Sequence, residues 1–264
     1  MATIGSVEEA VAWVDHVGVA LLYPNPDYVL PSLWEAVAGQ VEIEWAVRDA
    51  DGKFLAFTPA MDKVWRWKDE LPAKRLACVG LHVARTSSVI APRLVAALLT
   101  LAGRSSSPDD FGEVEGLERD VAQASLELGR PASRRELRII VGTDKRRCDR
   151  AVNALQQKLV LTNAGRTDEE SGWPSTLHDL FARRWRARLR NVPQRERALA
   201  ALAEAVLAGS GDVSAADLAA ALRIRRREAN EVLEALEAHG RAVRHDEDGI
   251  AVWRAVSPAQ APAA

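Results

Sequence analysis

The chain has 264 residues, with 35 Lys and Arg against 37 Asp and Glu, which gives a formal net charge of −2. This balance excludes a low-complexity or strongly charged polymer, and the length is sufficient for several small domains. The two cysteines, Cys78 and Cys148, lack partners at metal-ligand spacing, so no zinc finger or disulfide framework is expected. The longest apolar run, residues 94–101 with their flanks, is far short of the roughly 20 residues that cross a bilayer. We therefore expect a cytoplasmic protein without a membrane segment.

The near-neutral total hides a basic segment in the middle of the chain. Residues 130–198 carry 17 basic side chains against 8 acidic ones, which is close to +9. The remainder of the chain is correspondingly acidic, near −11. Such an asymmetry is typical of chains that present one basic face to a polyanion.

The N-terminal third has helical apolar spacing over residues 7–17 and 31–38. Residues 42–47 and 54–58 flank Asp49-Ala50-Asp51-Gly52, which predicts a hairpin. Helical spacing returns over residues 89–101. The segment between the expected hairpin and residues 89–101 includes Trp65-Arg66-Trp67-Lys68-Asp69-Glu70-Leu71-Pro72. We interpret it as a strand edge that ends in charged residues, and a polar and aromatic cleft is the alternative. Residues 104–110 form the expected linker.

A repeat with an offset of 81 residues follows the linker. Val121 falls on Leu202, and Leu155 falls on Leu236, without a gap between them. Each copy predicts an apolar helix (117–128 and 198–208), a Ser suited to cap a short helix, and a third helix (145–158 and 226–238). A β-branched stretch ends each copy.

The second copy closes with a predicted hairpin, residues 241–245 and 250–253 around the turn at 246–249. Three helices and a hairpin predict a winged helix, and the N-terminal third shows the same pattern of elements less clearly. The expected fold is mainly α with small β-hairpins (α+β), in three tandem winged-helix (helix-turn-helix) modules. Their expected ranges are 1–103, 111–191 and 192–256, with a disordered tail at 257–264.

Two basic turns begin the third helices of the repeat. Lys145, Arg146 and Arg147 fall on Arg226, Arg227 and Glu228 at the 81-residue offset. In a helix-turn-helix this position faces DNA, where unpaired backbone N–H groups and Lys or Arg side chains bind phosphate. The alternative is a solvated polar face. The same clusters add three further candidate DNA contacts, namely Arg150, Arg223 and Arg225.

A third basic run places five Arg around Trp185 in residues 183–190. On a helix, Arg183, Arg186 and Arg190 share a face and can follow a phosphate backbone while the aromatic ring packs or stacks. The alternative is a helix between domains, in which Phe181, Trp185 and Leu189 pack inward and the arginines are solvated.

No familiar catalytic motif is found, and the five His are scattered singly, so we expect no metal and no cofactor. However, Leu30-Pro31-Ser32-Leu33-Trp34-Glu35-Ala36-Val37 and the Trp65–Pro72 segment resemble motifs of the AlkZ-related proteins. The resemblance covers roughly residues 7–256. It implies kinship with the AlkZ/YcaQ DNA glycosylases, which combine tandem winged helices with a C-terminal β-barrel and release alkylated or crosslinked purines. The chain ends soon after the third module, so we expect no counterpart of that barrel.

The resemblance also implies a catalytic Gln-x-Asp or Gln-x-Gln pair after an apolar helix. The alignment places Leu21 and Tyr23 there, and neither side chain supplies a carboxylate base. Asp27 is the nearest carboxylate and the one catalytic candidate. We expect a non-catalytic, nucleoid-associated protein that binds duplex or damaged DNA in a repair setting. The alternative is a divergent DNA glycosylase that excises alkylated or crosslinked purines, and a transcription regulator is the weaker alternative.

Overall fold

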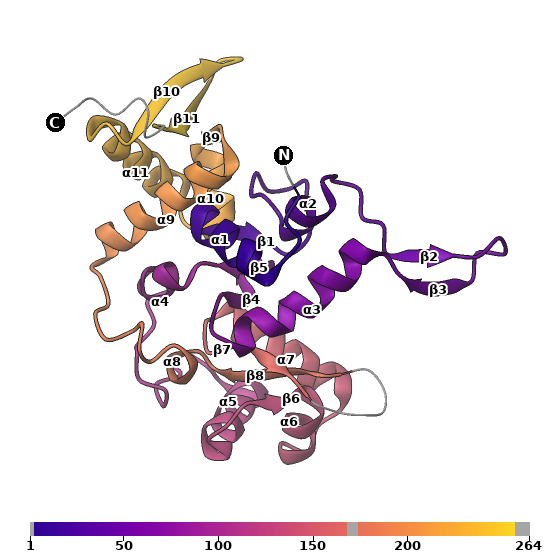
Figure 1. Cartoon of the computed structure of the whole chain (residues 1–264). Helices are drawn as coiled ribbons and strands as arrows, with labels where there is room; N and C mark the ends of the chain where they lie inside the picture. Colours follow the sequence, from indigo (N-terminus) through magenta and orange to yellow (C-terminus); the bar gives the residue numbers. More distant parts are fainter. Residues whose placement is uncertain (1–2, 168–173, 257–264) are drawn as a thin grey trace.

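The computed structural model describes residues 3–167 and 174–256. In this part of the chain, helices combine with four small antiparallel sheets of two or three strands (Figure 1), so the expected α+β class is confirmed. One order of elements occurs three times: helix, strand, helix, helix, strand, strand. In each three-stranded sheet the last strand of the unit lies between the other two. The three units therefore share one topology.

The first unit begins at the N-terminus. It contains α1 (Val7–Val17), β1 (Val19–Leu21), α2 (Leu33–Ala38), α3 (Pro59–Ala73), β4 (Cys78–Val83) and β5 (Thr86–Ile90). An additional hairpin, β2 (Ala46–Arg48) and β3 (Phe54–Phe57), is inserted between α2 and α3 and projects from the body (Figure 1). The chain then continues through η1 (Pro92–Leu94) and α4 (Val95–Leu101).

Two expectations for this unit are wrong. Residues 65–72 do not form a strand edge, because they lie in α3, where the Thr58 hydroxyl caps the Met61 N–H and Pro59 occupies the first turn. The helix expected over residues 89–101 starts later, because Val89 and Ile90 are the end of β5 and pair with β1. A short buried strand and a buried helix have the same apolar signature.

The second and third units repeat this order at the predicted 81-residue offset. The second contains α5 (Gly116–Leu128), β6 (Ala132–Ser133), α6 (Arg134–Ile140), α7 (Lys145–Gln157), β7 (Leu161–Arg166) and β8 (Thr176–Leu180), followed by the short α8 (Phe181–Arg184). The third contains α9 (Arg195–Ser210), β9 (Val213–Ser214), α10 (Ala215–Leu222), α11 (Arg226–Ala238), β10 (Ala242–Glu247) and β11 (Ile250–Ala255).

A serine begins the second helix of every unit. Ser32, Ser133 and Ser214 each accept a hydrogen bond, at 3.1 to 3.2 Å, from the backbone N–H three residues later. That third residue is acidic in every unit, and in the first and third its carboxylate accepts from the serine N–H in return, which completes a capping box. The sequence thus specifies where the first strand stops and the second helix starts.

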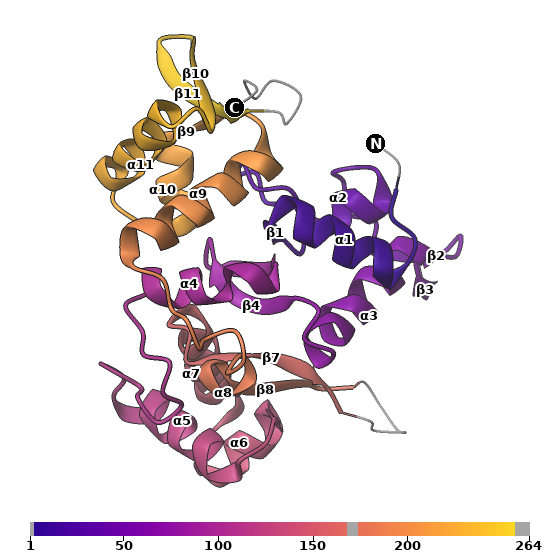
Figure 2. The same cartoon turned by 60° about the vertical axis from the view of Figure 1, so that its left-hand side comes forward.

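The units differ in how they share a core. The buried apolar residues of the first and third units form one continuous cluster, in which α4 packs against α9, whereas the second unit has a cluster of its own. Figure 2 shows the first unit between the other two. The boundaries expected at 103, 111 and 191 stay predictions, and the expected disordered tail at 257–264 lies outside the described residues. No helix of the described residues has the length and apolar character of a membrane span.

The second unit is fastened to the first along β7. Helix α3 packs against this strand at Gly165, whose φ is +131° and where a Cβ would lie 3.1 Å from that of Ala73. Nearby, His82 of β4 is buried, with Nδ1 donating to the Gln156 carbonyl at 2.9 Å and Nε2 lying 3.0 Å from the Thr162 hydroxyl. A close backbone approach and a buried polar network thus hold the two units together.

Candidate nucleic-acid interface

The start of α7 presents a cluster of free cations. The Asp144 carboxylate caps the helix by accepting from the Arg147 N–H at 2.9 Å. This cap fixes the first turn, so the next side chains point outward. The predicted residues here are exposed and have no side-chain partner within the described residues: Lys145, Arg146, Arg147 and Arg150. Their charges are therefore available to an external anion.

A hollow of about 280 Å³ lies beside this turn. Its lining includes Arg135 and Arg138 of α6, neither of which was singled out in the sequence. Arg134 also lines it but is already occupied, because it bonds His178 Nε2, Asn153 Oδ1 and Asp149. Arg135 and Arg138 are three residues apart on a predicted short helix, and this spacing could have indicated that they share one face.

His178 is the buried partner of Arg134 in this wall. Its pKa is lowered to about 3, first by burial and then by the positive charges of Arg134 and Lys68. The ring is therefore neutral at physiological pH and accepts from the Arg134 Nε–H at 3.2 Å. Arg134 is thus held as a structural cation, which leaves Arg135, Arg138 and the α7 turn for binding.

The start of α11 is the equivalent turn of the third unit. Arg226 and Arg227, two of the predicted DNA contacts, are exposed there. Arg227 pairs with Glu231 at 2.7 Å, but its side chain is 90% exposed, so this pair contributes little stability and can exchange with phosphate. Unlike α7, α11 has no side-chain cap, because Arg225 occupies the position before its first turn.

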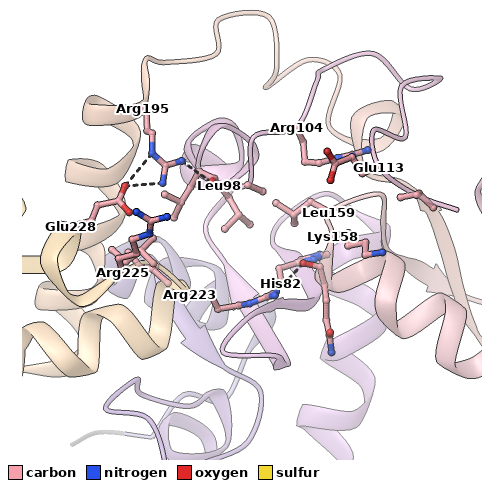
Figure 3. A pocket seen from close by; sticks show the side chains of 16 residues that line it. His82, Leu98, Arg104, Glu113, Lys158, Leu159, Arg195, Arg223, Arg225 and Glu228 are labelled. Atoms are coloured by element: carbon pink, nitrogen blue, oxygen red, sulfur yellow. Dashed lines mark hydrogen bonds and ion pairs between the residues drawn. The ribbon is translucent and has the colours of Figure 1, made fainter.

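Arg223 and Arg225 are exposed as well, and both line a cavity of about 530 Å³ where all three units meet (Figure 3). Its basic lining residues are Arg104, Lys158, Arg195, Arg223 and Arg225, against Glu113 and Glu228. The floor is apolar and includes Leu98, Leu101, Leu159 and Leu222. This grouping was not predicted, because its members come from distant segments of the chain.

Most of the cavity's cations are partly satisfied by the protein. Arg195 pairs with Glu228 at 2.7 Å, and Arg223 donates to the Gln157 carbonyl at 3.1 Å. Burial lowers the pKa of Arg223, and the neighbouring charge of Arg85 lowers it further. Arg225 has no side-chain partner within the described residues. The cavity therefore has a surplus of positive charge.

The run at 183–190 is not the continuous helix that was expected. Helix α8 ends at Arg184, so Arg183, Arg186 and Arg190 do not share one helical face. Arg183 is bound internally, to Asp179 at 2.6 Å and to the carbonyls of Ser125 and Arg130. Trp185 is only 2% exposed, whereas Arg186 and Arg190 are exposed. The inward-packing alternative describes this segment better.

The implied catalytic position holds no polar pair. Leu21 is fully buried in β1. The Tyr23 hydroxyl lies 3.6 Å from the Met61 sulfur, and its pKa is raised to about 12 by burial and by the charge of Asp69. Asp27 lies in the exposed loop that follows, where its N–H bonds Asn25 Oδ1 at 3.0 Å. Tyr23 thus stays protonated, and Asp27 is the nearest carboxylate in the loop.

One group in the described part of the chain has the spacing to hold a metal ion: Asp212, His245 and Glu247. These residues lie around the third unit's hairpin, and His245 and Glu247 are exposed. The Asp212 carboxylate is already engaged by Arg254, whose Nε donates to it at 2.9 Å. A metal ion would have to displace that guanidinium, so the group is an ion-pair cluster.

Known proteins resemble this chain in sequence and in structure. Residues 4–223 match the model of a family described as AlkZ related. No curated protein sequence matches the chain. Among solved structures it is similar to the DNA glycosylase AlkZ of Streptomyces sahachiroi, with 16% identity and a TM-score of 0.48 over 75% of this chain and 56% of that one. The DIP2311 protein of Corynebacterium diphtheriae aligns with 18% identity and a TM-score of 0.22, over 76% of this chain and 40% of that one. The chain thus spans about half the length of these proteins.

Proposed function

The chain belongs to the AlkZ-related family, and we propose that it is a non-catalytic protein of three tandem winged-helix modules that binds duplex or damaged DNA through the second and third of them. The observation that carries the proposal is the repeated unit of three helices and a three-stranded sheet, with an exposed basic turn at the start of α7 and of α11. In a winged helix this third helix enters the major groove. A nucleoid location follows from such binding.

The first module has a different role in this proposal. Its third helix, α3, packs on the second unit, where the Asp69 carboxylate accepts from the Thr176 hydroxyl at 3.2 Å and pairs with Lys68 at 2.7 Å. Asp69 is buried, and the helix begins with Thr58 and Pro59 in place of a basic turn. We therefore assign DNA contact to the second and third modules and a scaffolding role to the first.

The absence of catalysis in this proposal rests on the position after β1. Neither Leu21 nor Tyr23 can activate water or stabilise a sugar cation by charge. The competing function is a divergent glycosylase that uses Asp27, whose loop follows the same strand. Asp27 is exposed at the surface, which favours the simpler role of a turn residue.

We expect salt-dependent binding of the wild-type protein to duplex DNA, with a smaller salt dependence when Lys145 and Arg146 are both replaced by Ala. Each phosphate contact contributes about −0.9 to the slope of log K against log salt, so the double variant should lose up to about 2 from that slope. Fluorescence anisotropy across a salt series measures it. The matched control, Lys63→Ala with Arg66→Ala on α3, removes two charges outside the proposed face and should leave the slope unchanged.

An unchanged slope in the Lys145 and Arg146 variant would remove the α7 turn from the interface. The loss should also be similar on unrelated DNA sequences, because phosphate contacts carry no sequence information. A preference of about 10³ or more for one sequence would favour the transcription regulator.

We expect no base excision by the wild-type protein or by Asp27→Asn. Purified protein is incubated with alkylated and with crosslinked duplexes, and alkali then converts each abasic site to a strand break. A general base or charge stabiliser contributes about 10² to 10⁴ in rate, so an Asp27-dependent enzyme would lose that factor in the Asn variant. Purine release by the wild type that is lost in Asp27→Asn, at unchanged DNA affinity, would establish the glycosylase instead.

A further inference from the structure

The internal repeat reveals three replacements that converge on one cavity. At the 81-residue offset, Arg223 occupies the position of Gly142, and both residues are left-handed, with φ of 58° and 62°. Leu159 likewise occupies the position of Gly240, with φ of 55° against 68°. A side chain in this conformation is strained where glycine is not. The two units thus share a backbone, but the cavity carries side chains where the other copy has glycine.

The third replacement removes a helix cap. Asp144 caps α7 through a 2.9 Å bond to the Arg147 N–H, whereas its counterpart Arg225 makes no cap bond at the start of α11. The first N–H groups of α11 therefore lack the anionic oxygen that α7 has. The replacement also places a cation at this position, so the N-terminal end of α11 is suited to bind the anionic group of a ligand.

The surroundings of that helix end form a lined pocket of about 530 Å³. Arg195 and Lys158 lie on the rim, where each is paired with a carboxylate, of Glu228 at 2.7 Å and of Glu118 at 2.6 Å. The Arg104 guanidinium donates to two backbone carbonyls, and its buried Nε has no hydrogen-bond partner within the described residues. Leu98 and Leu159 (Figure 3), together with Leu101 and Leu222, supply the apolar part of the lining, which we take as the floor of the pocket. A pocket of this size with an apolar base and a few convergent polar groups is typical of small-molecule sites.

We propose that this cavity binds a nucleotide. Its phosphate takes the place of the missing cap at α11, with Arg225 and Arg223 as its charged ligands, and its base lies on the apolar floor. The guanidinium groups supply charge-assisted hydrogen bonds to phosphate oxygens. The nucleotide is either free or part of a DNA strand, since both present the same group. The site adjoins the α11 turn that is assigned to duplex DNA but is separate from the α7 turn, so loss of duplex binding in the α7 variants and loss of nucleotide binding here are distinguishable.

The test uses isothermal titration calorimetry of the full chain with deoxyguanosine 5′-monophosphate. We expect saturable binding that weakens by about tenfold or more in Arg225→Asp and in Arg223→Gly, the fold-change of one lost charge-assisted hydrogen bond. Both substitutions copy the residue of the second unit. Arg225→Asp restores the cap and Arg223→Gly relieves the left-handed strain, so both should raise the melting temperature by a few degrees. Binding and stability thus move in opposite directions, which a merely structural role does not produce.

Three further probes separate the parts of the ligand and its source. Inorganic phosphate and deoxyguanosine should each bind more weakly than the nucleotide, because each lacks one of the two contacts. A single-stranded oligonucleotide with a 5′-phosphate that displaces the nucleotide identifies DNA as the source, and failure to displace it identifies the free nucleotide. The control Arg197→Asp, on α9 but outside the cavity, should bind as the wild type does. No binding by the wild type, or equal binding by folded Arg225→Asp, overturns the proposal.

Discussion

Lowering the pH from 7 to about 4.5 is expected to reduce the free energy of unfolding by roughly 3 kcal/mol for each of two buried histidines. Burial lowers the pKa of His82 from 6.5 to about 4. Burial, with the charges of Arg134 and Lys68, lowers the pKa of His178 to about 3. Both rings are therefore neutral in the folded chain at a pH where the unfolded chain has already bound protons.

The direction follows from proton binding by the two states. Below pH 6.5 the unfolded chain binds more protons than the folded one, so the free energy of unfolding falls with pH until the folded pKa is reached. The two histidines cease to contribute to the pH dependence about one unit above pH 6.5, where they are neutral in the unfolded chain as well. Urea denaturation at a series of pH values measures the slope.

The contribution of each histidine is isolated by comparing slopes among variants. His82→Gln should flatten the slope between about pH 6.5 and 4.5, even though it also destabilises the protein at pH 7. A wild-type slope equal to that of His82→Gln would show that this ring titrates alike in both states.

The sequence predicted best the parts that are encoded locally. Ser133 and Ser214 mark the second helices at one offset because a cap needs only a serine and the backbone three residues later. The hairpin of the third unit could be predicted equally well, since Asp248 and Gly249 supply the positive φ of its turn. Short-range chemistry of this kind does not depend on the rest of the fold.

The errors arose where a local signal competed with composition. The density of aromatic and charged residues in 65–72 suggested a strand, although Thr58 and Pro59 were already a helix start. Two of the charges, Lys68 and Asp69, belong to the contact with the second unit, which the linear sequence does not show. Asp69 is buried against Thr176, more than a hundred residues away.

The cavity could not have been located from the sequence, although its signs were present there. Arg104, Lys158 and Arg223 are brought together only when the three units pack. The repeat alignment nevertheless contained the pairs Gly142 with Arg223 and Asp144 with Arg225. A position that is glycine or a cap in one copy and arginine in the other marks a place where the copies have diverged in function, and the packing then shows what surrounds it.

Trp185→Ala is expected to lower the free energy of unfolding by about 3 to 5 kcal/mol, the cost of removing a large buried aromatic side chain. Trp185 is 2% exposed and belongs to the cluster that joins the first and third units, so it is a core residue and cannot stack on a base from outside. Chemical denaturation measures the loss. The matched control Trp45→Ala removes a ring that is 48% exposed and should cost less than about 1 kcal/mol. Base stacking would give the reverse pattern, with stability retained and DNA binding weakened by about 1 to 3 kcal/mol. That result would show that Trp185, Arg186 and Arg190 belong to the nucleic-acid interface.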